Sequence, residues 1–165
     1  MKNLFRFFVI AFTVSVLISS VSCSSDEDTE PYYPHHCELA LTIPDSYKQK
    51  ESEDFDAFFS NGEAGVAITR LTFAGPVNDD LEPSMFPSEV ARKYAEKNGL
   101  SDSVKIFDEE AYSYFSVSSG GYYTLYSFYR SRYAHFIVSY TCREEKIKQY
   151  SGEFLKYASE AYFTE

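Results

Sequence analysis

The sequence predicts an α+β protein, in which an antiparallel sheet of about six strands is flanked by helices. Short runs rich in aromatic and β-branched residues recur along the chain, as expected of strands. Gly120-Gly121 separates two such runs, which is typical of a tight hairpin. The chain then closes with apolar residues at helical spacing. With 165 residues, 44% of them apolar, the chain is long enough for one hydrophobic core and short for a two-domain enzyme.

Residues 1–22 are predicted to be a secretory signal peptide. Lys2 and Arg6 supply a positive start, residues 7–18 carry no charge, and small residues precede Cys23. The uncharged stretch is shorter than the roughly 18–20 apolar residues that span a bilayer. This length favours a cleaved signal over the alternative, an uncleaved membrane anchor.

The segment around Cys23 resembles the start of a bacterial lipoprotein. Ser20-Val21-Ser22-Cys23 resembles a lipobox, in which the cysteine thiol receives a diacylglycerol and becomes the new N-terminus. Ser25-Asp26-Glu27-Asp28 resembles the acidic surface-export signal of Bacteroidota-type lipoproteins. The resemblance implies a lipid on Cys23 and a cell-surface position on the outer membrane. The alternative interpretation of the acidic run is a solvated linker.

Residues 23–36 form the predicted tether, and residues 37–165 form the predicted single α+β domain. The tether is acidic and contains Pro31 and Pro34, each of which biases the preceding residue toward extended geometry. The formal net charge of the whole chain is −10. Nucleic acid is therefore an unsuitable partner, because phosphate binding needs a basic surface.

The first part of the domain is predicted to be mostly strands. Residues 38–43 form a strand that stops at a proline, and residues 55–59 form a second apolar run. Asn61-Gly62 is a strong hairpin dipeptide because both residues tolerate positive φ. Residues 64–73 are rich in Val, Ile and Thr and form the next strand, and residues 74–83 form a loop.

A helix is predicted over residues 87–98. Pro87 suits its first turn, Val90 and Tyr94 repeat at helical spacing, and Gly99 ends it. A short strand is expected at residues 104–107.

The last part of the domain contains the clearest hairpin, formed by residues 111–117 and 122–129. A long strand follows over residues 133–142, and a helix over residues 144–162 closes the chain. The apolar stripe of this helix comprises Ile147, Tyr150, Phe154, Leu155, Ala158 and Tyr162.

This order of elements resembles the PsbP-like fold. That fold is shared by an extrinsic photosystem subunit, the Mog family of Ran-binding proteins and many bacterial lipoproteins. The residues that carry the resemblance are Leu41-Thr42-Ile43-Pro44, the helix at 87–99, Gly120-Gly121 and the terminal amphipathic helix. The resemblance covers most of residues 38–163 and implies an α/β/α sandwich. It also implies a protein-binding or accessory role, although a fold does not fix a function.

Two cysteines remain if Cys23 carries lipid. Cys37 begins one alternating apolar run, and Cys142 ends another. Since exported thiols tend to pair, we predict a Cys37–Cys142 disulfide between the first and last strands of the sheet. Two buried free thiols are the alternative.

The hairpin at Gly120-Gly121 predicts two faces, because a two-residue turn pairs residues whose numbers sum to 241. One face carries apolar side chains for the core, namely Phe115, Val117, Tyr126 and Phe128. The other carries Tyr112, Tyr114, Tyr123 and Tyr129, which form the candidate partner-binding face, since binding surfaces favour Tyr. The alternative is that a helix covers this second face.

The loop Arg130-Ser131-Arg132 leaves the register of the following strand open. An odd-length loop is favoured, because it places Phe136 and Val138 beside Phe115 and Phe128; a one-residue slip would reverse this. Arg130 and Arg132 are interpreted as a solvated tip, with contact to an anionic partner as the alternative.

The sequence predicts no catalytic residue, no cofactor and no metal site. His35-His36-Cys37 is interpreted as the end of the tether, because adjacent residues of an extended chain point apart. His135 is interpreted as a structural or surface residue. The favoured function is therefore a non-catalytic protein-binding or accessory module. The alternatives are a sugar- or nutrient-binding lipoprotein that uses the Tyr face, and a small hydrolase with an unrecognised site.

Overall fold

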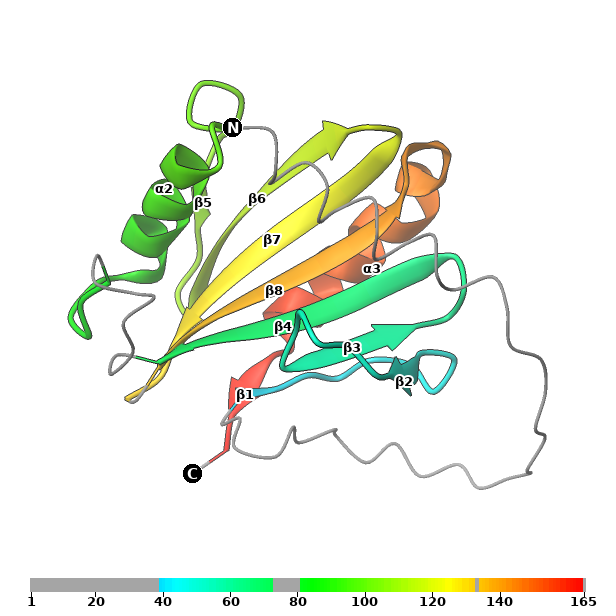
Figure 1. Cartoon of the computed structure of the whole chain (residues 1–165), viewed down its shortest axis with the longest axis horizontal. Coiled ribbons are helices and arrows are strands. Elements are labelled where there is room, and N and C mark those ends of the chain that lie inside the picture. The colour runs from blue at the N-terminus through cyan, green and yellow to red at the C-terminus, as the bar shows by residue number, and fades with distance from the viewer. Residues whose placement is uncertain (1–38, 73–80, 133, 165) are drawn as a thin grey trace.

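The computed structural model describes residues 39–72, 81–132 and 134–164, and its fold is a mixed α+β fold built on one large antiparallel sheet (Figure 1). Seven strands follow one another across the sheet in the order β2-β3-β4-β8-β7-β6-β5. The predicted fold class is confirmed. The strands are β2 (Lys48–Lys50), β3 (Ala57–Ser60), β4 (Ala64–Thr72), β5 (Phe107–Asp108), β6 (Tyr112–Ser119), β7 (Tyr122–Arg130) and β8 (Ala134–Arg143).

A second, two-stranded sheet joins the two ends of the described chain. β1 (Leu39–Ala40) pairs antiparallel with β9 (Tyr162–Phe163). The strand predicted over residues 38–43 is therefore shorter within the described residues and lies outside the main sheet. The closing helix also ends before Tyr162, because that residue belongs to β9.

The two α-helices of the described residues lie on opposite faces of the main sheet. α2 (Pro87–Lys97) contacts β5, β6 and β7, whereas α3 (Ile147–Ser159) contacts β7 and β8 and lies behind the sheet in Figure 1. A 3-10 turn, η1 (Glu144–Lys146), leads into α3. No helix of the described residues is long and apolar enough to cross a membrane.

α2 begins at Pro87, as the sequence indicated, and ends at Lys97, one residue before the predicted end. Pro87 occupies its first turn, and the Glu89 carboxylate accepts a hydrogen bond of 2.7 Å from the Phe86 N–H. At the other end Gly99 has φ +69°, and the Leu100 N–H donates to the Ala95 carbonyl. Glycine adopts this backbone conformation without strain.

The α3 face holds the larger core. Aromatic side chains of α3 meet aromatic and branched side chains of the sheet, and the ring centroids of Tyr140 and Phe154 lie 5.6 Å apart. Nine of its twenty buried residues are Tyr or Phe, each of which buries a large area. Its buried members include Leu39, Tyr47, Phe59, Val66, Ile68, Leu125, Phe136, Val138, Tyr150, Phe154 and Tyr157.

The α2 face holds a smaller, separate core. Val90, Ala91 and Ala95 of the helix are buried against the sheet. Tyr94 packs its ring 5.3 Å from that of Tyr126 and 5.6 Å from that of Phe128, measured between centroids. The predicted core face of the hairpin is thus confirmed, with Phe115 and Phe128 fully buried.

One predicted register is confirmed and one is wrong. β6 and β7 pair with residue numbers that sum to 241 along the whole hairpin, from Ser119 opposite Tyr122 to Tyr112 opposite Tyr129. The loop between β7 and β8 has an even number of residues. It is closed by Ser131 and Ala134: the Ser131 N–H donates to the Ala134 carbonyl, and the Ser131 Oγ accepts from the Ala134 N–H.

This even loop moves two side chains to the other face. Phe136 lies opposite Tyr129 and Val138 lies opposite Ser127, so both belong to the α3 core. Ile137 takes the place beside Phe128 that an odd loop would have given to Phe136. The slip of one residue exchanges the two faces of β8.

Candidate functional site

The four tyrosines of the candidate partner-binding face do share one face of the sheet, but two of them are buried. Tyr112 is 9% exposed and Tyr129 is 2% exposed. The Tyr129 hydroxyl donates a hydrogen bond of 2.8 Å to the Ala158 carbonyl of α3. The prediction that these two residues form a contact surface is therefore wrong. Tyr114 and Tyr123 remain half-buried at the border of the core.

Phe107, which the sequence did not single out, extends this face to the edge of the sheet. Its ring stacks on Tyr114 with centroids 5.0 Å apart and an angle of 13° between the planes. Tyr114 in turn stacks on Tyr112 at 5.9 Å, and Tyr112 on Tyr129 at 5.5 Å. We call these four residues the aromatic strip. It runs from Phe107, which is 40% exposed, to Tyr129 in the core.

A charged side chain of each sign lies next to the aromatic strip. The Lys105 ammonium lies over the Phe107 ring, 4.8 Å from its centroid. Burial, and then the charge of Glu109, raises the pKa of Tyr112 and of Tyr114. The exposed end of the strip, formed by Phe107 and the half-buried Tyr114, is thus bordered by an ammonium and a carboxylate.

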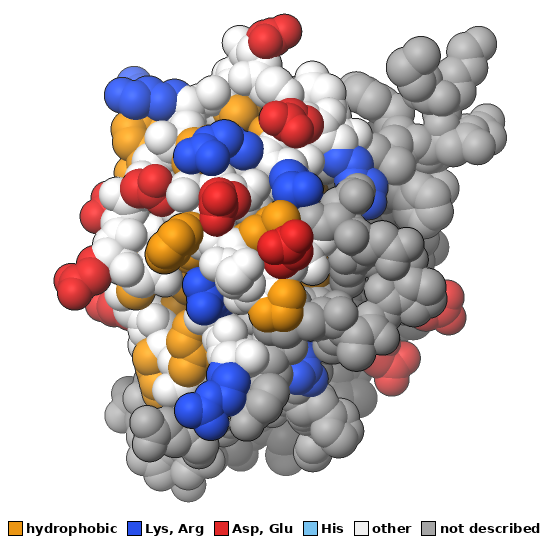
Figure 2. Space-filling view, turned by 90° about the vertical axis from the view of Figure 1, so that its left-hand side faces the viewer, with side chains coloured by type: hydrophobic (Ala, Val, Ile, Leu, Met, Phe, Trp, Pro, Cys, Tyr) orange, Lys and Arg blue, Asp and Glu red, His pale blue; other side chains and the backbone are white. Residues whose placement is uncertain are grey.

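The side of the molecule that carries α2 has a mixed surface. Figure 2 shows Lys and Arg, Asp and Glu, and apolar side chains interspersed on this side. Phe86 is 66% exposed, and the Arg130 guanidinium lies 6.0 Å from its ring centroid. Arg130 and Arg132 are both exposed, and Arg130 donates a hydrogen bond of 3.0 Å to the Ser84 carbonyl.

His135 is a structural residue, one of the two roles that the sequence suggested. It is fully buried, and its Nε2 lies 3.0 Å from the Glu82 carbonyl oxygen. Burial lowers the pKa of the imidazole, although the hydrogen bond with Glu82 acts in the opposite direction. Together with Arg130 it fixes the segment before α2 to the β7–β8 hairpin.

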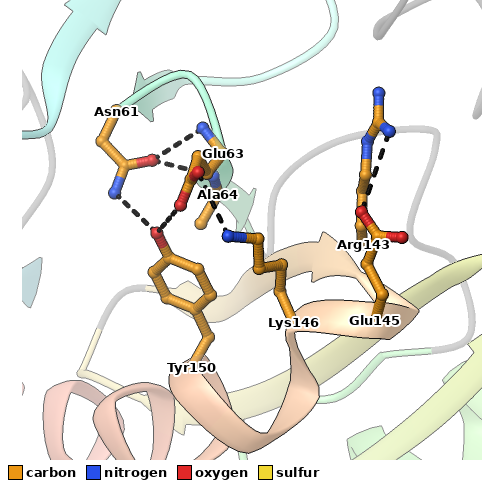
Figure 3. Close-up of polar contacts among 7 residues, drawn as sticks. All are labelled: Asn61, Glu63, Ala64, Arg143, Glu145, Lys146 and Tyr150. Carbon is orange, nitrogen blue, oxygen red and sulfur yellow. Dashed lines mark hydrogen bonds and ion pairs between the residues drawn. The ribbon is translucent and has the colours of Figure 1, made fainter.

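A polar cluster joins the β3–β4 turn to the start of α3 (Figure 3). The Tyr150 hydroxyl donates to Glu63 Oε2 at 3.0 Å, and Lys146 Nζ donates to Glu63 Oε1 at 3.3 Å. These two hydrogen bonds lower the pKa of the Glu63 carboxyl. Asn61 holds the turn, since its Oδ1 accepts the N–H groups of Glu63 and Ala64. The cluster therefore links the β3–β4 turn to the start of α3 and has a structural role.

A hollow of about 650 Å³ lies where the β6–β7 turn meets the junction of β8 and α3. Arg143 and Glu145, 4.0 Å apart, form an exposed ion pair at its border (Figure 3). The turn glycines have open space around them. The described residues that line the hollow are Gly120, Gly121, Tyr122, Arg143, Glu144 and Glu145.

The anchor and export residues, Cys23 and Ser25-Asp26-Glu27-Asp28, lie outside the described residues, as do His35-His36-Cys37. Cys142 is fully buried and has no disulfide partner among the described residues, and burial raises the pKa of its thiol. Because Cys37 is outside the described residues, the disulfide stays a prediction. Within the described segments, no three His, Cys, Asp or Glu side chains come together as a metal site.

Comparison with known proteins supports the fold. The sequence matches no family model and no curated protein. Among solved structures, the chain is similar to the solution structure of cyanobacterial PsbP (CyanoP) from Synechocystis sp. PCC 6803. The TM-score is 0.58 at 13% sequence identity, and the match covers 87% of this chain and 98% of that one. The fold is therefore PsbP-like, as the order of elements indicated.

Proposed function

We propose that this chain is an exported, lipid-anchored cell-surface lipoprotein whose PsbP-like domain binds a protein partner as a non-catalytic accessory module. The signal-like segment, Cys23 and the acidic run after it support the anchor and the export. The PsbP-like fold supports the accessory role by analogy.

The observation that carries the binding role is the exposed end of the aromatic strip. Phe107 is 40% exposed, and Tyr114, which stacks on it, is half-buried. Tyr123 is half-buried on the same face of the sheet. Protein interfaces are enriched in aromatic residues at their centres, because these residues bury a large area with little loss of side-chain entropy. The flanking Lys105 and Glu109 supply a polar border.

The stacking favours a protein over a sugar as the ligand of this surface. A sugar ring packs on the free face of an aromatic ring. Here Tyr114 and Tyr112 each have two stacked neighbours, and the Phe107 ring is contacted by Tyr114 and by the Lys105 ammonium. Rings whose faces are already in contact suit the side chains and backbone of a polypeptide better than a sugar ring.

The anchor is tested by the substitution Cys23→Ala in the full chain. Loss of the lipid should move the protein from the membrane fraction to the soluble fraction, because the lipid supplies most of the membrane affinity. The matched control is Ser24→Ala, which should leave the protein in the membrane. Tight membrane attachment of the Cys23→Ala chain would remove the lipid anchor from the proposal.

The contact surface is tested by placing a photoreactive benzoylphenylalanine at Phe107 in cells that produce the full chain. A discrete cross-linked adduct is expected on illumination. The same amino acid at Leu155, which is 36% exposed on α3, serves as the control. Equal adducts at both positions, or none at Phe107, would contradict a partner at the aromatic strip.

A further inference from the structure

Asparagine is followed by glycine twice in the sequence, at Asn61-Gly62 and at Asn98-Gly99. Such a dipeptide is prone to lose its side-chain amide, because the backbone nitrogen of glycine approaches the asparagine Cγ with no side chain in the way. Both dipeptides lie within the described residues, and in each the asparagine is half-buried and the glycine is exposed. Exposure therefore does not distinguish the two sites.

The reaction uses the dipeptide and water alone. The glycine nitrogen attacks the asparagine Cγ, a new C–N bond closes an imide ring, and the bond from Cγ to Nδ2 breaks. The proton of the glycine N–H passes through water to the departing nitrogen, which leaves as ammonia. Water then opens one of the two C–N bonds of the imide, which gives aspartate or isoaspartate. Hydrogen bonds that hold the reacting groups in another geometry slow the first step.

At Asn61-Gly62, hydrogen bonds restrain every reacting group. Asn61 Oδ1 accepts the N–H groups of the two residues after Gly62, at 2.9 and 2.8 Å (Figure 3). Asn61 Nδ2 donates to the Tyr150 hydroxyl at 3.4 Å, and the Gly62 N–H donates to Ser60 Oγ at 3.0 Å. Since Tyr150 also donates to Glu63, the turn is tied to α3. Attack by Gly62 therefore requires that the turn open and separate from a second element.

At Asn98-Gly99, the hydrogen bonds within the described residues come from α2 itself. Asn98 Nδ2 donates to the Tyr94 carbonyl at 2.7 Å, and the Gly99 N–H donates to the Glu96 carbonyl at 3.0 Å. Both acceptors lie in the last turns of the helix. Because helix ends fray, these two bonds open without the loss of contacts to another element.

We propose that Asn98-Gly99, at the end of α2, is a site of spontaneous deamidation in the folded protein, and that the fold protects Asn61-Gly62 from the same reaction. The difference lies in what must open before the glycine nitrogen can attack. At one site it is the last turn of a helix, and at the other it is a turn tied to α3. The inference is independent of the proposed binding role.

The modification changes the end of α2. The Leu100 N–H donates to the Ala95 carbonyl at 2.7 Å and, with the bond from Gly99, closes the helix in a Schellman motif. Isoaspartate at position 98 lengthens the backbone by one carbon and moves both donors away from their carbonyls. Aspartate instead places a carboxylate beside the Tyr94 carbonyl, at the negative end of the helix dipole. Either product weakens the end of α2.

The test follows both sites in one sample. The purified full-length chain in detergent is incubated at neutral pH, folded and in concentrated urea. Trypsin then releases the two dipeptides in separate peptides, residues 51–70 and 98–105, and each conversion raises the mass of its peptide by about 1 Da.

Similar rates are expected in urea, where the fold no longer distinguishes the sites. In the folded chain we expect conversion at Asn98 to be roughly tenfold faster than at Asn61, or more, because the helix end opens more often. Equal rates at the two sites of the folded chain, faster conversion at Asn61, or no conversion at either site would overturn the proposal.

The matched variants are Tyr150→Phe and Tyr157→Phe, both on α3. Tyr150→Phe removes the hydroxyl that binds Asn61 and Glu63, so conversion at Asn61 should rise while that at Asn98 stays the same. Tyr157, whose hydroxyl donates to Glu153, is the control, and its variant should change neither rate. Global unfolding would raise both rates together and is thereby recognised. An unchanged rate at Asn61 in Tyr150→Phe would exclude protection by α3.

The effect on α2 is measured on the converted chain, which anion exchange separates by its added negative charge. Hydrogen exchange at the Leu100 amide should be faster in this fraction than in the unconverted fraction, because the Schellman motif is weakened. Equal exchange in the two fractions would contradict the effect on α2.

Discussion

At the scale of single residues, His135 makes stability depend on pH in the weakly acidic range. Burial lowers its pKa below the ordinary value of 6.5, so the fold favours the neutral imidazole. Its contribution to the free energy of unfolding is complete above pH 6.5 and is lost as the pH falls toward the folded-state pKa. Chemical denaturation between pH 7.5 and pH 5 should show this fall in the free energy of unfolding, and the substitution His135→Gln should reduce the fall. If the free energy of unfolding depended on pH equally in both chains, this role of His135 would be contradicted.

Tyr129 is a second residue with a single, measurable contact. Its hydroxyl donates to the Ala158 carbonyl near the end of α3. Tyr129→Phe should lower the free energy of unfolding by about 1–2 kcal/mol, because a buried carbonyl loses its donor. Tyr123→Phe, at a half-buried ring on the same strand, should cost about 0.5 kcal/mol or less. Urea denaturation of the two variants measures the difference, and equal losses would mean that the hydrogen bond contributes nothing specific.

At the scale of elements, the start of α2 depends on one carboxylate. Glu89 accepts the Phe86 N–H, which has no carbonyl partner in the first turn. Glu89→Ala should destabilise the protein by about 0.5–1 kcal/mol, measured by thermal or urea unfolding. Glu96→Ala, on the same helix outside the first turn, is the matched control and should have a smaller effect. A larger effect at Glu96 would be incompatible with capping.

Whether the sequence could predict the register of a hairpin depended on how its turn is closed. Gly120 and Gly121 both have positive φ, at +62° and +81°, and such a turn admits one length and one register. The β7–β8 turn is closed by the Ser131 side chain, which accepts the Ala134 N–H. Serine fits many loop lengths, so the sequence did not favour the even loop that the structure has.

The elements that the sequence missed are too short to carry a pattern. β2 is Lys48–Lys50, which has no apolar alternation, and β9 is two residues long. β2 pairs with the four-residue β3, and β9 pairs with β1, which is itself two residues long. At the site, the sequence grouped the four tyrosines correctly on one face and left open whether a helix covers that face. It did not indicate that α3 contacts Tyr129 while Phe107 stays exposed.

At the scale of the whole molecule, the buried tyrosines limit stability in alkali. Burial raises the pKa of Tyr129 and Tyr140 well above 10, and burial together with Glu153 raises that of Tyr157 to about 12. Because the fold favours the neutral phenols, their contribution is complete below pH 10 and is lost as the pH rises above it.

This predicts a cooperative transition in alkali. The melting temperature should fall above pH 10, and absorbance of tyrosinate should rise together with loss of the far-ultraviolet circular dichroism. Tyr162→Phe, at a 43% exposed ring, should leave the transition in place. Gradual ionisation of all tyrosines before any loss of structure would contradict it.

The β1–β9 pair gives the molecule a distinct response to mechanical load. Leu39 and Ala40 lie at the start of the described domain and pair with Phe163 and Tyr162 close to the other end of the chain. A pull on the domain through its N-terminal side therefore acts first on a ladder two residues long. That ladder should unzip at low force, while the seven-stranded sheet, loaded only afterwards, stays intact.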